Sequence, residues 1–448
     1  MASRRIVDMR RDIITMYRAG LEAVEPGAAV RRHCRLDNNR LMVDDFAYNL
    51  DLFENVFVIG AGKAAAPMAK ALEKILGNRL KGGVINVKYG HLDEVKKVLI
   101  HEAGHPVPDQ AGMEGARDIF ALAQRASATD LVICVVSGGG SALLPMPVPE
   151  VTLEEKQKTT QVLLECGATI HEINAVRKHI SSVKGGRLAQ AVYPATLVSL
   201  ILSDVIGDDL DVIASGQTAP DSSTFQDCLT IFDRYDIRNK LPESVLQYIV
   251  KGVEGSKPET PKPGDPIFEK TRNLIIGNNL QCVLAAQKTA QDLGYNTLVL
   301  STLIEGETKE VAKVHAAIAK EISKTGMPVQ RPACVLSGGE TTVKIRGGGL
   351  GGRNQEFALA FGLEIAGWDG IVALSIGTDG TDGPTDAAGA ITDGTMLTRA
   401  AELGLDPRLF LSDNDSYHFF EPLGDLVRTG PTKTNVMDLR LVLIDGET

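Results

Sequence analysis

The sequence of 448 residues lacks the paired cysteines of a disulfide framework. Its six cysteines are scattered, and no Cys-x-x-Cys pair occurs. Most of them stand in apolar stretches, as Cys134 does in LVICVVSGGG, which predicts buried and reduced thiols. The chain also has no apolar run long enough to span a membrane, and its charged N-terminus lacks the apolar core of a secretory signal. We therefore expect a cytoplasmic protein with no membrane partner.

No long basic run offsets the excess of acidic residues. The chain has 47 Lys and Arg against 57 Asp and Glu, a formal net charge of -10. This charge argues against a general surface for nucleic acids, although an anionic small molecule can bind where positive groups converge. Hydrophobic residues make up 44% and charged residues 23%, which is typical of a globular protein, and the length predicts two or three domains.

Short apolar runs ending in glycine-rich turns alternate with helical patterns, after an amphipathic helix predicted over 9–24. This alternation predicts an α/β fold with a parallel sheet covered on both faces, in which ligands bind at the carboxyl ends of strands. A stretch rich in Pro, Gly and charge, 252–266, predicts a linker or a mobile loop, after which a second α/β domain begins. The predicted strands lie at 55–60, 82–87, 97–104, 130–141 and 196–207, then at 273–279, 297–302, 333–340, 370–380 and 439–444.

The turn Gly60-Ala61-Gly62-Lys63-Ala64-Ala65 follows the first of these runs and fits three interpretations. GxGxxA is a dinucleotide pattern, but the second strand ends in Lys88 without the carboxylate that would hold a ribose. A lysine at a helix N-terminus favours phosphate instead, because free N–H groups and a point charge both attract anions. The third interpretation is a tight strand–helix turn with a solvated lysine.

Two further glycine-rich segments resemble each other, Ser137-Gly138-Gly139-Gly140-Ser141 and Ser337-Gly338-Gly339-Glu340-Thr341. Glycines flanked by hydroxyls expose backbone N–H groups that can cradle a phosphate or carboxylate, although a flexible turn is the alternative. Arg353 follows a glycine-rich stretch and could grip such a group bidentately. A basic segment, 177–187, includes Lys184 and could offset phosphate charge or form a solvated helix face.

Carboxylates gather after two predicted strands. Asp379, Asp382 and Asp386 alternate with glycines and threonines, and Asp204 ends another apolar run. Oxygen ligands suit Mg²⁺, whereas a polar loop with aspartates making local turns is the alternative.

Taken in order, these segments resemble the glycerate 2-kinase family, with its DUF4147-type N-terminal and MOFRL-type C-terminal domains. The matching stretches include VFVIGAGKAAAPMA, EAGHPVPD, SGGGSALL, INAVRKHISSVKGGRLA, LSDVIGDDLDVIASGQTAPD, LSGGETTV, GGRNQEFALA and GTDGTDGPTDAAGA. The resemblance implies ATP- and Mg²⁺-dependent phosphorylation of the 2-hydroxyl of D-glycerate. It also implies a Rossmann-like domain and a smaller α/β domain with the active site in the cleft between them. We expect the first domain at 1–250, completed by a segment near 430–448, and the second at 270–430.

By position, Lys63, Asp204 and Arg353 match the catalytic residues of that family. We expect Asp379, Asp382 and Asp386 to bind the metal. Asp204 is expected either to bind it with them or to accept the hydroxyl proton. The residues expected to bind substrate or phosphate are Gly62, Ser137, Gly138, Gly139, Gly140, Ser141, Lys184, Ser337, Gly338, Gly339 and Glu340. Two rival functions stay open, an NAD(P)-dependent hydroxypyruvate reductase and a non-catalytic sensor. A homodimer is one assembly that the sequence allows.

Overall fold

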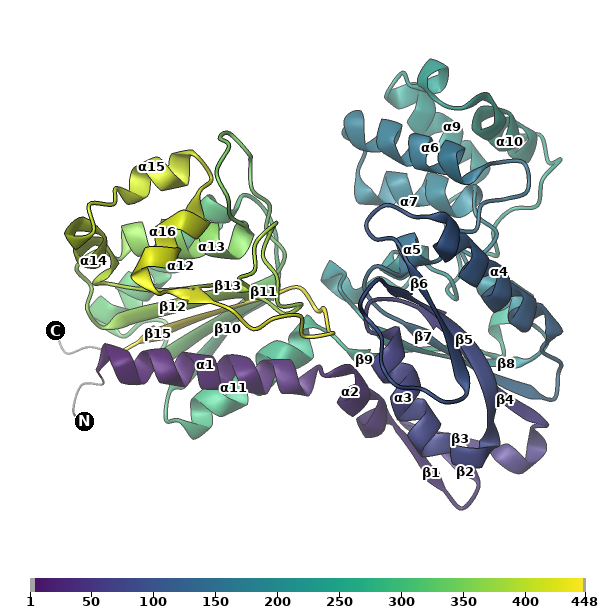
Figure 1. Cartoon of the computed structure of the whole chain (residues 1–448), viewed down its shortest axis with the longest axis horizontal. Helices are drawn as coiled ribbons and strands as arrows, with labels where there is room; N and C mark the ends of the chain where they lie inside the picture. Colours follow the sequence, from purple (N-terminus) through teal and green to yellow (C-terminus); the bar gives the residue numbers. More distant parts are fainter. Residues whose placement is uncertain (1–4, 446–448) are drawn as a thin grey trace. The chain divides into compact units, whose positions relative to one another are not determined.

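A computed structural model describes residues 5–445 and divides the chain into two compact units (Figure 1). The continuous unit is Pro26–Ile276, and the split unit joins the residues up to Glu25 with those from Gly277 onwards. No helix within the described residues is long and apolar enough to cross a membrane. All six cysteines are free, and all but the half-buried Cys166 are buried, which confirms the interpretation of their apolar surroundings.

The continuous unit is built on a six-stranded sheet with the strand order β6-β5-β4-β7-β8-β9. The pairs β4–β5, β5–β6, β4–β7 and β7–β8 are parallel, so the predicted Rossmann-like sheet is confirmed. The strands are β4 (Asn55–Ala61), β5 (Leu80–Lys88), β6 (Val98–Ala103), β7 (Asp130–Val136), β8 (Thr196–Leu202) and β9 (Thr271–Gly277).

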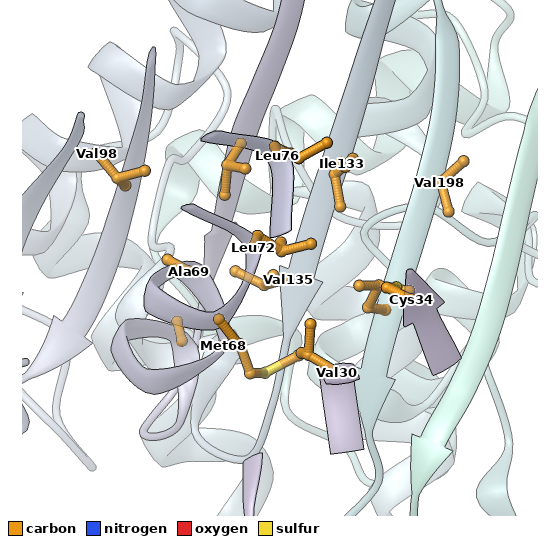
Figure 2. Packing of buried hydrophobic residues seen from close by; sticks show 14 of the residues in the cluster. Val30, Cys34, Met68, Ala69, Leu72, Leu76, Val98, Ile133, Val135 and Val198 are labelled. Atoms are coloured by element: carbon orange, nitrogen blue, oxygen red, sulfur yellow. The ribbon is translucent and has the colours of Figure 1, made fainter. Parts of the chain in front are cut away.

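Both faces of this sheet are covered, because successive side chains of a strand point to opposite faces. In β7, Ile133 and Val135 belong to one core cluster, while Val132 and Cys134 belong to the other. Figure 2 shows side chains of helix α3 pointing toward β7 in the first cluster. That face is covered by α2 (Pro26–His33), α3 (Ala65–Leu76) and an antiparallel meander, β1 (Cys34–Asp37), β2 (Arg40–Val43) and β3 (Phe46–Asn49). The other face carries α4 (Gln110–Arg125), α5 (Gly140–Leu143) and α8 (Arg187–Val192).

Four further helices of this unit pack around an apolar core of their own. Three begin with a capping box, as at Thr152 and Glu155, in which side chains satisfy the first free N–H groups of the helix. The helices are α6 (Leu153–Glu165), α7 (Ile170–His179), α9 (Phe225–Arg234) and α10 (Glu243–Val253). Short 3-10 helices occupy Leu50–Leu52, Gly77–Arg79, Ile206–Asp208, Ile213–Ser215, Arg238–Lys240 and Pro266–Phe268.

The split unit has a mixed sheet in the order β10-β11-β15-β12-β13-β14. Its strands are β10 (Asn296–Ile304), β11 (Ala333–Gly339), β12 (Ile371–Gly377), β13 (Gly389–Asp393), β14 (Leu426–Val427) and β15 (Asp438–Ile444). Helices α1 (Ile6–Ala23) and α11 (Asn279–Asp292) cover one face, and α12 (Thr308–Thr325) and α13 (Arg353–Glu364) cover the other (Figure 1). Helices α14 (Met396–Glu402), α15 (Pro407–Ser412) and α16 (Ser416–Leu423) pack beside α13.

The units differ from the expected domains in four places. Helix α1, expected in the first domain, belongs to the split unit. Strand β15, expected to complete the N-terminal domain, lies between β11 and β12 and is antiparallel to both. Strand β9, expected to open the second domain, is the edge of the first sheet. The segment 252–266 is part of the continuous unit, where Thr260 is buried and Glu259 bonds to His179 at 2.9 Å. These contacts, which composition does not reveal, put the boundary after β9.

Candidate active site

Three loops meet at one edge of the sheet in the continuous unit. Ala61 at the end of β4 lies beside Val136 at the end of β7, and β8 runs parallel to β7. The turn carrying Lys63, the loop 137–141 and the loop with Asp204 therefore start from the carboxyl ends of three neighbouring strands. The strand order reverses between β4 and β7, which is the point where open α/β sheets bind ligands.

Lys63 lies in a turn that is fastened to the neighbouring loop just before α3 begins. Its backbone N–H donates to the Gly138 carbonyl at 2.9 Å, and the Ala64 N–H donates to Ser137 Oγ at 3.0 Å. Gly62 has φ of +151°, and a Cβ there would lie 2.0 Å from Ser137 Oγ. The glycine is therefore required by the approach of Ser137, and the turn presents the lysine at the N-terminus of a helix.

Two histidines lie beside this turn. His91 Nδ1 lies 3.0 Å from the Lys63 carbonyl oxygen, and the ring of His105 lies against the Gly139 backbone. Burial, followed by the charges of Lys63 and Lys88, lowers the pKa of His105 to about 4. His105 is therefore neutral at pH 7 in a local field that favours anions, although the whole chain is acidic. Its motif, EAGHPVPD, carried the family resemblance, but the sequence did not point to either histidine as a site residue.

The far end of the 137–141 loop enters a polar cluster. Ser141 Oγ lies 2.8 Å from Ser215 Oγ and accepts a hydrogen bond from Arg177 Nη2 at 2.6 Å. Ser215 in turn donates to Asn174 Oδ1 at 3.0 Å, and Lys184 Nζ donates to the Ser141 carbonyl at 2.7 Å. The structure thus brings the predicted residues Ser141 and Lys184 together.

The second glycine segment has a different structure from the first. Ser337, Gly338 and Gly339 are the last residues of β11, fully buried and paired with β15. A Cβ on Gly338 would lie 1.6 Å from Asn279 Oδ1, and one on Gly339 would lie 2.3 Å from the Ile304 carbonyl oxygen. The expected ligand-binding loop is therefore a strand end, and its glycines make room for neighbouring residues of the protein.

We expect Gly338→Ala to lower the free energy of unfolding of the split unit by about 1–3 kcal/mol, because the added methyl group must displace Asn279. Trp368, the single tryptophan of the chain, lies in the same unit, so urea unfolding followed by its fluorescence measures this change. Gly348→Ala is the matched control, since nothing lies within 4 Å of its Cβ position. Equal stability of the two variants would contradict the packing role.

Arg353, the first residue of α13, forms ion pairs within the split unit. Its Nε and Nη2 donate to the two oxygens of Asp438 at 2.8 and 3.0 Å, and its Nη1 lies 2.9 Å from Glu340. Asp438 is fully buried and also accepts from Arg440 Nη2 at 3.0 Å and Asn354 Nδ2 at 2.9 Å. Asp438 and Arg440 were not predicted as site residues, although charged residues inside the apolar run MDLRLVLI were a signal.

Asp382 closes the N-terminus of α13. Its oxygens accept hydrogen bonds from the backbone N–H groups of Asn354 at 3.0 Å and Gln355 at 2.8 Å. Burial raises the pKa of Asp382 to about 6, and these backbone donors oppose the shift. The predicted metal ligand is therefore engaged in satisfying free helix N–H groups.

The other two carboxylates of that segment turn to different partners. Asp379 Oδ1 accepts from the backbone of Thr381 at 3.1 Å, whereas Asp386 pairs with Arg428 at 3.0 Å and accepts from the Tyr417 hydroxyl at 2.8 Å. Within residues 5–445, no group of three or more His, Cys, Asp or Glu side chains could hold a metal ion. Within the split unit, Asp379, Asp382 and Asp386 are therefore not gathered into one cage.

Comparisons with known proteins agree along almost the whole chain. Residues 12–250 match the family described as a domain of unknown function, DUF4147, and residues 333–438 match the MOFRL family. A D-glycerate 2-kinase of Thermotoga maritima is 42% identical over 432 residues, which are 96% of this chain and 97% of that protein. A protein of Agrobacterium vitis named putative hydroxypyruvate reductase is 45% identical over 389 residues, 86% of each chain.

A solved structure leads to the same family. The crystal structure of glycerate kinase from Thermotoga maritima has a TM-score of 0.86 and 40% identity, covering 98% of this chain and 99% of that chain. Most of the length of the chain and its architecture are thus shared with glycerate kinases. The chain belongs to the glycerate 2-kinase family.

Proposed function

We propose that this protein transfers the γ-phosphoryl group of ATP to the 2-hydroxyl of D-glycerate and yields 2-phosphoglycerate. The observation that carries the proposal is the pairing of the Lys63 turn with the 137–141 loop at the switch point of a parallel sheet. Phosphoryl transfer needs positioning and charge neutralisation more than covalent chemistry, and this edge offers a lysine, a helix N-terminus and backbone N–H groups.

In this proposal Lys63 neutralises charge on the transferred phosphoryl group. Asp204, half-buried in the loop just after β8, accepts the proton of the 2-hydroxyl. The hydroxyl oxygen of D-glycerate forms a bond to the γ-phosphorus at the same time, and the bond between this phosphorus and ADP breaks. The partly exposed guanidinium of Arg353, already paired with Asp438 and Glu340, contacts a further anionic group.

Mg²⁺ fits this site only as an ion that arrives with the nucleotide. The described residues build no three-ligand cage, and Mg²⁺ in kinases is held by one or two carboxylates together with phosphates and water. Asp204 would hold it as the alternative to its role as proton acceptor, and the ion would neutralise phosphate charge. The free, mostly buried cysteines support a reducing compartment such as the cytoplasm.

Phosphorus NMR with D-glycerate, ATP and Mg²⁺ tests the proposal. We expect a 2-phosphoglycerate signal that disappears when any one of the three is omitted. A 3-phosphoglycerate signal would reassign the acceptor hydroxyl, and no phosphoglycerate at all would reject the kinase.

A hydroxypyruvate reductase is the second candidate, because the relative from Agrobacterium vitis carries that name. Two observations weigh against it. Strand β5 ends in Lys88 rather than in a carboxylate for a ribose, and Cβ positions on Gly60 and Gly62 are filled by Val135 and Ser137. The glycines of the Lys63 turn therefore make room for contacts with β7 rather than for a bound pyrophosphate. Oxidation of reduced nicotinamide on addition of hydroxypyruvate, followed by absorbance, would support the reductase.

A further inference from the structure

Two cations contact Ser141 in the continuous unit, and the charge of a third, Lys156, acts on that of Lys184. Lys156 lies on α6, Arg177 on α7, and Lys184 between α7 and α8. Two of them hold Ser141 directly, through its carbonyl and its hydroxyl. Among residues 5–445, none of the three forms an ion pair with a carboxylate, and Lys156 and Arg177 both act on the charge of Lys184.

The cluster has donors without acceptors. Lys156 is 4% exposed, and its Nζ is enclosed with no hydrogen-bond partner. The Nε of Arg177 is likewise enclosed and without a partner, while the rest of this side chain and Ser141 are only half-buried. A buried cation without an acceptor costs free energy, and such groups are normally paired. The unused donors therefore indicate an acceptor that comes from outside the chain.

The effect on protonation agrees with the geometry. Burial, and then the charge of Arg177, lowers the pKa of Lys156 to about 7. Burial lowers the pKa of Lys184 well below its usual value, with Lys156 and Arg177 adding to the shift. No acidic group opposes either shift, so an anion bound here would restore the charged forms.

A neighbouring lysine shows how this fold treats a cation with a structural role. Lys178, next to Arg177 on α7, is as buried as Lys156 but pairs with Asp211 at 2.9 Å and with Asp221 at 3.2 Å. The same helix thus carries one cation with two carboxylates and one with none. The absence of carboxylates around Lys156 is therefore a local property of the cluster near Ser141.

We propose that Lys156, Arg177 and Lys184, beside Ser141, form an oxyanion site that takes the carboxylate of the hydroxy-acid substrate. The inference rests on the proposed function and deepens it. One end of the 137–141 loop bonds to the Lys63 turn, and the other enters this cluster. In a 2-hydroxy acid the reacting hydroxyl is on the carbon bearing the carboxylate, so anchoring the carboxylate at Ser141 selects that hydroxyl.

Calorimetric titration of Lys156→Met with D-glycerate, without nucleotide, tests the site. We expect the Kd for D-glycerate to rise about 10- to 100-fold, as for the loss of a charged hydrogen bond, and the Kd for ATP to stay unchanged. The melting temperature without ligand should rise or hold, because the substitution removes an unpaired buried cation. If Lys156 had only a structural role, its replacement would lower the melting temperature and leave the Kd for D-glycerate unchanged.

Two matched lysines serve as controls. Lys158→Met, exposed on the same helix, should match the wild type in binding and melting. Lys178→Met should lower the melting temperature, because it leaves Asp221 buried without its cation. If Lys156→Met does not fold, Lys184→Met replaces it, with the same expected loss of D-glycerate binding.

The outcomes separate the site from the function. An unchanged Kd for D-glycerate in a Lys156→Met enzyme whose wild type phosphorylates D-glycerate would overturn the site alone. Weakened binding of ATP only would overturn the carboxylate assignment in favour of a phosphoryl group. Binding of D-glycerate that depends on Lys156 but never leads to phosphorylation would support the site and reject the kinase.

Discussion

Replacing Lys63 by alanine should lower kcat for phosphorylation of D-glycerate by about 10²–10³-fold, the usual loss when one group that stabilises transition-state charge is removed. Folding should change little, because hydrogen bonds of the Lys63 backbone hold this turn. Steady-state kinetics with separate titrations of ATP and D-glycerate measure the first effect. Thermal unfolding measures the second.

Lys70→Ala is the control for this variant. Lys70 lies on the same helix, α3, and makes a surface ion pair with Asp93, so its removal should leave kcat at the wild-type level. A Lys63→Ala enzyme with a kcat within about threefold of the wild type would contradict the role in charge neutralisation. The solvated lysine of a tight turn would then be the correct interpretation.

Asp438→Ala should lower the free energy of unfolding of the split unit by about 3–5 kcal/mol. This carboxylate is fully buried between two guanidinium groups, those of Arg353 and Arg440. Arg440 is itself fully buried, and its Nε and Nη1 have no hydrogen-bond partner. Removal of the Asp438 carboxylate therefore leaves the buried cation of Arg440 without this counter-ion. Breaking a buried ion pair in this way is strongly destabilising.

Urea unfolding followed by Trp368 fluorescence measures the change for Asp438→Ala in the unit where it occurs. Asp438→Asn keeps one acceptor oxygen and should fall between the alanine variant and the wild type. Asp386→Ala, which removes a surface ion pair with Arg428, should have no measurable effect. A loss below about 1 kcal/mol in Asp438→Ala would show that this cluster contributes little to stability.

The sequence predicted five of the six strands in the sheet of the continuous unit and the edge where its loops meet. Apolar runs that end in glycine indicate strands such as β4 and β7, and the helices between the strands indicate a parallel arrangement. The position of Lys63 at a strand end could therefore be read from the sequence. The hydrogen bonds between its turn and Ser137 could not, because they join residues far apart in the chain.

The likeness of the two glycine segments was a poor guide to structure. Ser137 to Gly140 leave β7 as a turn, whereas Ser337 to Gly339 continue β11 to its end. At Gly338 the amide of Asn279 fills the space that a side chain would take. A glycine shows in the sequence that space is needed, but only tertiary contacts reveal whether a ligand or a neighbour occupies it.

Buried charge was the hardest property to predict. In α6, LEEKQKTTQVLLE, Lys156 has the spacing of the buried face with Leu153 and Leu163, although its type is typical of a surface. Asp438 and Arg440 likewise alternate with leucines in β15. Period and residue type disagree at Lys156. In β15 the alternation is that of a half-exposed strand, and yet every residue of the strand is buried.

The split unit also fixes an order of events during synthesis on the ribosome. Helix α1 emerges first, yet its apolar side chains Met9, Ile13 and Met16 pack against α11, β12 and β15. The continuous unit can close as soon as β9 has been made, whereas α1 must wait for β15, a central strand translated last among those described. Premature termination before Asp438 would therefore deprive the split unit of the strand that joins the two halves of its sheet.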